Sequence, residues 1–205
     1  MTIESQFFSN QKTRSGFAAI IGAPNAGKST LMNFIVGAKV SIVTPKVQTT
    51  RTRIKGIAMV ADSQIIFIDT PGIFAPKRRL DRAMVNAAWQ GTDEADIILL
   101  LHDSARSSSD KETANIINRI ENIQREFPNR KFALILNKID LVKPEILLGK
   151  ASKLAKIVNF EKIFMISAKK GRGVKDLVRW LAEQMPQGPF LFDPNDLSDM
   201  PQRQL

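Results

Sequence analysis

The chain of 205 residues contains no cysteine, so a disulfide framework and a thiolate metal site are excluded. It also has no apolar run near the roughly 20 residues that a membrane-spanning helix needs. The polar N-terminus has no apolar segment of signal-peptide length. We therefore expect a cytoplasmic protein without a transmembrane helix.

Aromatic residues are few, at 7 %, and histidine occurs once, as His102 beside Asp103. A general-base role for His102 is tempting, but no serine or cysteine nucleophile motif accompanies it. We therefore predict a structural side chain. The tryptophans, Trp89 and Trp180, lie in helix-like stretches and are predicted to pack in the core.

Positive charge is in excess, with 30 Lys and Arg against 20 Asp and Glu and a net charge of +10. The excess suggests an anionic partner, either RNA or an acidic membrane surface, although a solvated face would have the same composition. The basic clusters are Lys46, Arg51, Arg53 and Lys55; Lys77, Arg78, Arg79 and Arg82; and Lys169, Lys170, Arg172 and Lys175.

Five short apolar runs, none of which alternates with polar residues, recur along the chain. Continuous apolarity predicts strands buried on both faces, as in a mostly parallel sheet. Residues 54–60 are expected to add an antiparallel edge strand. The five runs are residues 17–21, 65–68, 97–101, 132–136 and 163–166.

Helix-like stretches separate the runs, which predicts an α/β fold with helices on both faces of a six-stranded, mostly parallel sheet. Ligands of such sheets bind at the carboxyl ends of the strands. The stretches are residues 28–36, 80–90, 110–127, 144–158 and 174–185.

The strongest motif is GAPNAGKST at residues 22–30, which has the phosphate-loop spacing between a strand and a helix. Gly22, Ala26 and Gly27 would let backbone amides surround a phosphate, and Lys28 would reach the β- and γ-phosphates. The Ser29 hydroxyl would ligate magnesium, next to Thr30. A glycine-rich turn that matches by chance is the alternative, which the flanking strand and helix disfavour.

The sequence DTPG at residues 69–72 follows another buried strand. Asp69 would hold magnesium through water, and the Gly72 amide would meet the γ-phosphate. An ordinary Pro-Gly turn is the alternative.

The sequence NKID at residues 137–140 indicates which nucleotide base is bound. The Asp140 carboxylate can accept two hydrogen bonds from guanine N1–H and N2–H₂, which adenine does not offer. Asn137 and Lys138 would brace the loop and cover the base plane. In SAK, residues 167–169, the Ala168 amide would approach the guanine oxygen, with Ser167 and Lys169 beside it.

Together with QTTRTRIKGI, SAKKGRGV and MPQGPFLF, these motifs resemble translation-factor-related GTPases of the TrmE-Era-EngA class, and within it the Era family. The resemblance implies a P-loop NTPase G domain that binds GTP, GDP and Mg²⁺. We expect an N-terminal extension at 1–15, the G domain at 16–185 and a linker at 186–205 towards a missing KH domain. The resemblance implies that the intact protein binds 16S rRNA and the 30S subunit mostly through that domain and not through these residues. A monomer with peripheral inner-membrane contact is a further expectation.

The resemblance also suggests a switch threonine that bonds magnesium and the γ-phosphate. Thr49 and Thr50 both qualify, and Thr50 is favoured.

Ile73 follows Gly72 where related enzymes use glutamine to orient water. The resemblance implies that Asn25 holds K⁺, which would supply charge in the transition state. From the residue alone, an asparagine that only caps or turns the loop is the alternative. The predicted catalytic residues are Asn25, Lys28, Thr50 and Gly72.

The leading hypothesis is a slow GTPase whose switches report the nucleotide to an RNA-binding domain during assembly of the small ribosomal subunit. A guanine-nucleotide-binding module without significant turnover is a second hypothesis, which Ile73 favours. The G domain of another potassium-type GTPase is a third.

Overall fold

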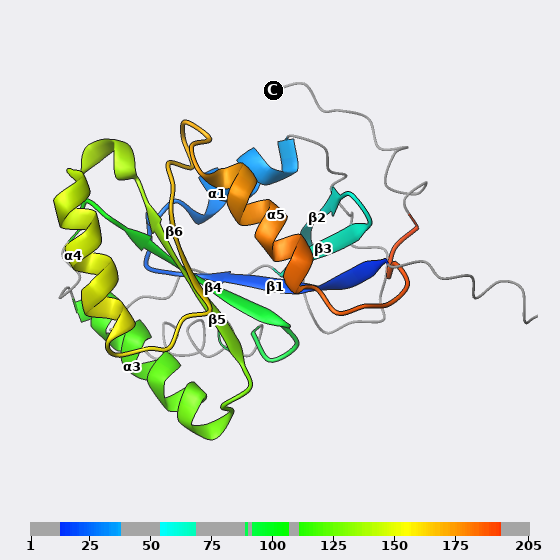
Figure 1. The fold of residues 1–205 in the computed structure, drawn as a ribbon, viewed down its shortest axis with the longest axis horizontal. Helices are drawn as coiled ribbons and strands as arrows, with labels where there is room; N and C mark the ends of the chain where they lie inside the picture. The colour runs from blue at the N-terminus through cyan, green and yellow to red at the C-terminus, as the bar shows by residue number, and fades with distance from the viewer. Residues whose placement is uncertain (1–12, 38–53, 69–88, 90–91, 107–110, 194–205) are drawn as a thin grey trace, which may run out of the picture.

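The computed structural model of the chain describes residues 13–37, 54–68, 89, 92–106 and 111–193. Its described part contains a six-stranded sheet in the order β2-β3-β1-β4-β5-β6 (Figure 1). The predicted α/β fold and all six predicted strands are confirmed. The strands are β1 (Arg14–Ile21), β2 (Ile54–Val60), β3 (Ser63–Ile68), β4 (Ile97–Asp103), β5 (Lys131–Asn137) and β6 (Lys162–Met165).

The central strand β1 pairs in parallel with β3 on one side and β4 on the other. Strands β4, β5 and β6 continue the parallel sheet. The edge strand β2 runs antiparallel to β3, as expected. The two strands are joined by a tight turn in which Ala61 has a positive φ of 49°. Parallel strands β1, β4, β5 and β6 therefore end at one edge of the sheet.

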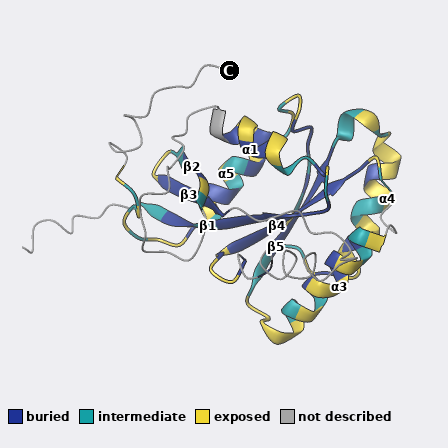
Figure 2. Ribbon diagram, turned by 180° about the vertical axis from the view of Figure 1, so that it is seen from behind, coloured by how far each residue is buried: buried dark blue, intermediate teal, exposed yellow. Residues whose placement is uncertain are grey.

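Helices cover both faces of the sheet (Figures 1 and 2). One face packs against α1 (Lys28–Gly37) and α5 (Val174–Gln184), and the other against α3 (Lys111–Glu126) and α4 (Pro144–Ala155). The helix predicted for 80–90 lies outside the described residues except for Trp89, which is helical and buried.

Helical periodicity explains which side chains enter the core. In α3, Thr113, Ile116, Ile117 and Ile120 are buried, which places them on one side of the helix at intervals of three and four residues. The three isoleucines pack with β4 and β5 in one hydrophobic cluster. The other cluster includes Leu177 and Leu181 of α5, and Trp180 packs against it as predicted.

The segment after α5 lies against the amino ends of β1 and β3. The buried side chain of Gln64 accepts hydrogen bonds from the backbone N–H groups of Leu191 and Phe192, both at 3.0 Å, and donates to the Phe192 carbonyl at 2.8 Å. Ser15 N also donates to Pro186 O at 3.0 Å. Residues 186–193 of the predicted linker are thus hydrogen-bonded to the domain, and β1 begins at Arg14, two residues before the predicted start of the domain at 16.

Candidate functional site

The loop at residues 22–27 joins β1 to α1 and is held in conformations that glycine favours. Gly27 has φ 103°, and a Cβ there would lie 2.3 Å from Asn137 Nδ2. Gly22 packs against β4 so closely that a Cβ would lie 2.3 Å from the Leu101 carbonyl oxygen. Larger residues at these two positions would displace the loop.

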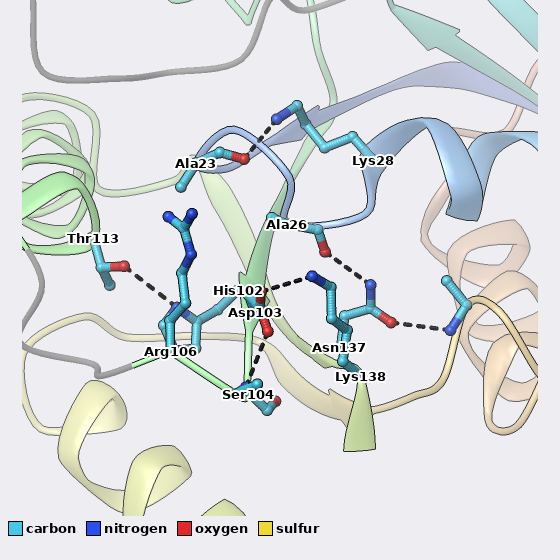
Figure 3. Close-up of polar contacts among 12 residues, drawn as sticks. Ala23, Ala26, Lys28, His102, Asp103, Ser104, Arg106, Thr113, Asn137 and Lys138 are labelled. Atoms are coloured by element: carbon cyan, nitrogen blue, oxygen red, sulfur yellow. Dashed lines mark hydrogen bonds and ion pairs between the residues drawn. The ribbon is translucent and has the colours of Figure 1, made fainter. Parts of the chain in front are cut away.

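Lys28 begins α1 and turns its side chain back over this loop (Figure 3). Its Nζ donates hydrogen bonds to the carbonyls of Gly22 and Ala23, both at 2.9 Å. Burial lowers the pKa of Lys28 from 10.5 to about 8, and the Glu112 carboxylate opposes this shift. The loop therefore surrounds a partly desolvated ammonium group at the end of β1.

Ser29 and Thr30 follow in the first turn of α1, and both are exposed. Asn25 is exposed at the tip of the loop with φ 62°, a left-handed conformation that asparagine adopts more readily than most residues. The backbone alone thus gives a reason for asparagine here. Among the described residues, no group of three or more His, Asp or Glu side chains is arranged to hold a metal.

Asn137, at the end of β5, links the loop to the segment after β6. The residue is 2 % exposed, and its side chain donates to Ala26 O at 2.8 Å and accepts from Ala168 N at 2.9 Å. The Ala168 amide that was predicted to approach a base oxygen is therefore engaged by Asn137. Residues distant in the sequence meet here at the carboxyl ends of β1, β5 and β6 (Figure 3).

Asp140 lies in a short 3-10 helix, η2 (Ile139–Leu141), beside this link. A hydrogen bond from the Ser167 side chain, followed by smaller contributions that include Lys170 and Lys169, lowers the pKa of Asp140 below its ordinary value. Lys170 Nζ lies 3.7 Å from Asp140 Oδ2. Asp140 therefore presents a carboxylate at neutral pH.

Lys138 has a left-handed backbone, with φ 63°, and directs its side chain towards the end of β4. Its Nζ lies 2.7 Å from Asp103 Oδ2. Sequence reasoning missed this partner, because only the parallel register of β4 and β5 brings the two residues together.

The structure brings together the predicted residues of three motifs at one edge of the sheet. They are Gly22, Asn25, Ala26, Gly27, Lys28, Ser29 and Thr30; Asn137, Lys138 and Asp140; and Ser167, Ala168 and Lys169. Thr49, Thr50, Asp69, Gly72 and Ile73 lie outside the described residues, so only Ser29 of the three predicted magnesium ligands is described.

His102 is buried, and its Nδ1 lies 3.4 Å from Thr113 Oγ1 of α3. This packing agrees with the predicted structural role.

Lys150 of α4 donates hydrogen bonds to the backbone carbonyls of Ser104, at 2.7 Å, and of Arg106, so it connects α4 to the loop after β4. No local sequence pattern indicated this contact.

The basic cluster after β6 is described, and its four residues Lys169, Lys170, Arg172 and Lys175 are exposed beside the site. The other two clusters fall largely outside the described residues. None of the described helices is long and apolar enough to cross a membrane.

Residues 17–138 match the protein family described as 50S ribosome-binding GTPase. Among curated relatives, GTPase Era of Brucella melitensis biotype 1 is 51 % identical over 194 residues, which cover 95 % of this chain and 60 % of the relative. GTPase Era of Bradyrhizobium diazoefficiens is 49 % identical over 205 residues, covering 100 % of this chain and 65 % of the relative. The chain spans about 60 % of the length of these relatives.

Two solved structures have the same fold and substantial sequence identity. A crystal structure of Era with MgGDPNP and nucleotides 1506–1542 of 16S ribosomal RNA matches with a TM-score of 0.71 and 37 % identity, over 93 % of this chain and 63 % of that one. A crystal structure of an Aquifex aeolicus Era variant bound to GDP and AlF₄⁻ matches with a TM-score of 0.70 and 36 % identity, over 93 % of this chain and 64 % of that one.

Proposed function

Because the chain belongs to the 50S ribosome-binding GTPase family and carries a G domain of the Era type, we propose that it binds GTP and GDP and hydrolyses GTP slowly. The observation that carries this proposal is the Asn137 side chain, which joins the loop at 22–27 to Ala168. This link joins the glycine-rich loop, which carries the Lys28 ammonium group, to the segment after β6, whose Ser167 hydrogen-bonds the Asp140 carboxylate.

The proposed roles follow from the chemistry of each group. The amides of the loop and Lys28 would bind the β- and γ-phosphates, and Asp140 would accept hydrogen bonds from the guanine edge. Lys138 would cover the base plane with its methylene stem. Ser29, with Thr50 and Asp69, would hold Mg²⁺, which neutralises phosphate charge when bound.

Hydrolysis needs a group that orients water or supplies charge, because Ile73 offers no hydrogen-bonding side chain. We propose that K⁺ held at Asn25 supplies part of that charge. The competing proposal is a binding module without significant turnover, in which Asn25 only serves the left-handed turn. The exposed position of Asn25 in the loop is compatible with both.

Asn25→Gly separates these proposals, because glycine keeps the left-handed backbone while the side chain is removed. We expect single-turnover hydrolysis of bound GTP to be about tenfold or more faster in K⁺ than in Na⁺ for the unmodified chain, and equal in both salts for Asn25→Gly. Quenched-flow phosphate assays at equal ionic strength measure this. Equal rates in both salts for the unmodified chain would exclude a role for K⁺, and no phosphate release in either salt would favour the binding module.

The lowered pKa of Lys28 predicts a pH-dependent affinity. Above a pH of about 8 the free protein holds Lys28 increasingly neutral, whereas bound phosphate favours the charged form. The nucleotide complex then holds more protons than the free protein, so GDP affinity is expected to fall as pH rises, by up to about tenfold per pH unit. Calorimetry at pH 8.5 in buffers of different ionisation enthalpy should detect proton uptake.

Lys28→Arg is the matched control for this effect, because arginine keeps its charge throughout this range. Loss of the guanine N1 proton at alkaline pH affects both proteins alike. Equal proton uptake by the variant and the unmodified chain would contradict the assignment to Lys28.

We further propose that the nucleotide state is read out in assembly of the small ribosomal subunit, in the cytoplasm. Support comes from the relative whose structure contains 16S rRNA nucleotides, and from the exposed basic cluster beside the base-binding segment. Reversing the charge of Arg172 and Lys175 in the intact protein should weaken binding to small subunits at low salt, and unchanged binding would remove this cluster from the proposal.

A further inference from the structure

Asp103 ends β4 and forms the ion pair with Lys138 described above. We propose that Asp103 is a positioning residue, which fixes the Lys138 side chain before guanine nucleotide binds; this inference rests on the proposed function. The side chain of Asp103 is 8 % exposed and that of Lys138 is 32 % exposed. The pair therefore lies at the border of the site, with the carboxylate on the buried side.

The backbone places the two residues in register. Asp103 pairs with Asn137 across the parallel strands β4 and β5, and Lys138 is the next residue. The Ser104 amide donates to the Asn137 carbonyl at 2.9 Å, which continues the pairing beyond the end of β4. The left-handed conformation of Lys138 then allows its side chain to cross towards Asp103 (Figure 3).

Both oxygens of the Asp103 carboxylate have partners. Oδ2 accepts from Lys138 Nζ at 2.7 Å, and Oδ1 accepts from the Ala105 amide at 3.0 Å. A carboxylate held at both oxygens rotates little, and a largely buried charge needs its partner. Asp103 therefore holds the ammonium group of Lys138 at one defined point.

Holding one end of the lysine also orders the rest of its side chain. A free lysine samples many rotamers, and the freedom that is lost on binding reduces affinity. With the ammonium fixed by Asp103, the four-carbon stem is arranged as an apolar surface against which a base plane can lie. Asp103 would thus increase affinity through Lys138 without touching the base.

A double-mutant cycle on dissociation of a fluorescent N-methylanthraniloyl-GDP tests this inference. Asp103→Asn keeps the shape and an acceptor for Ala105, and Lys138→Met keeps the stem but removes the ammonium. We expect about tenfold faster dissociation for each single variant, and no further acceleration in the double variant. The dissociation rate should rise by a similar factor for GDP and IDP, because Lys138 covers the plane of the base and does not contact its N2 edge.

Asp103→Glu serves as a second variant, because it keeps the charge but displaces it by one methylene, and it should be less impaired than Asp103→Asn. Dissociation from Asp103→Asn at the rate of the unmodified chain would overturn the inference. Single effects that multiply in the double variant would also overturn it, because Asp103 would then act independently of Lys138. If the unmodified chain itself binds no GDP, the proposed function fails and the inference fails with it.

Discussion

Replacement of Asp140 by asparagine is expected to lower GDP affinity by about 10³-fold or more and to make xanthine diphosphate the preferred ligand. A site that is built to pair with a specific polar edge rejects a mismatched edge by roughly 10⁴–10⁵. The hydrogen bond from Ser167 keeps the pKa of Asp140 low, so the unmodified chain offers an acceptor to guanine N1–H and N2–H₂. The asparagine amide offers one donor in its place, which suits the xanthine oxygen at C2.

Competition of GDP and xanthine diphosphate against a fluorescent nucleotide measures this exchange. Asp176→Asn is the matched control, because Asp176 is exposed on α5 in an ion pair with Arg179. It should leave both affinities unchanged. An Asp140→Asn variant that keeps GDP affinity within about twofold would contradict the assignment of Asp140 to the base.

Replacement of Asn137 by alanine is expected to destabilise the fold by about 2–6 kcal/mol and to lower GDP affinity by about 10²-fold. The change removes the partners of the Ala26 carbonyl and the Ala168 amide in a buried region. Each buried polar group left without a partner costs about 1–3 kcal/mol. The substitution also removes the connection between the loop at 22–27 and the segment after β6, so nucleotide binding would have to order both segments.

Urea unfolding and GDP titration measure the two effects of Asn137→Ala. Asn118→Ala is the matched control, because Asn118 is exposed on α3, and it should change stability by less than about 0.5 kcal/mol. If Asn137→Ala cost less than about 1 kcal/mol and left GDP affinity unchanged, the bridge would not organise the site.

Five of the strands were predictable because each carries a short continuous apolar run, the pattern that burial on both faces of a sheet produces. The loop at 22–27 was predictable because its glycines and Lys28 have a fixed spacing between a strand and a helix. Asp140 was predictable from its place at the end of β5. These features depend on short stretches of sequence.

Contacts between distant residues were not predictable in the same way. The pairing of Asp103 with Lys138 depends on the register of β4 with β5, and the contact of Gln64 with residues 191 and 192 joins positions 127 and 128 residues apart. A polar residue inside an apolar strand, as Gln64 is, was the available signal for the second contact. Its partners are backbone groups, which have no sequence signature.

Selective binding of guanine nucleotides at this edge of the sheet underlies every role proposed above. Competition of GDP, IDP and ADP against a fluorescent GDP, in Mg²⁺ at neutral pH, measures that selectivity. We expect GDP to bind most tightly, IDP more weakly because it lacks the N2 amino group, and ADP at least about 10³-fold more weakly than GDP. ADP binding within about tenfold of GDP would show that the site does not select guanine.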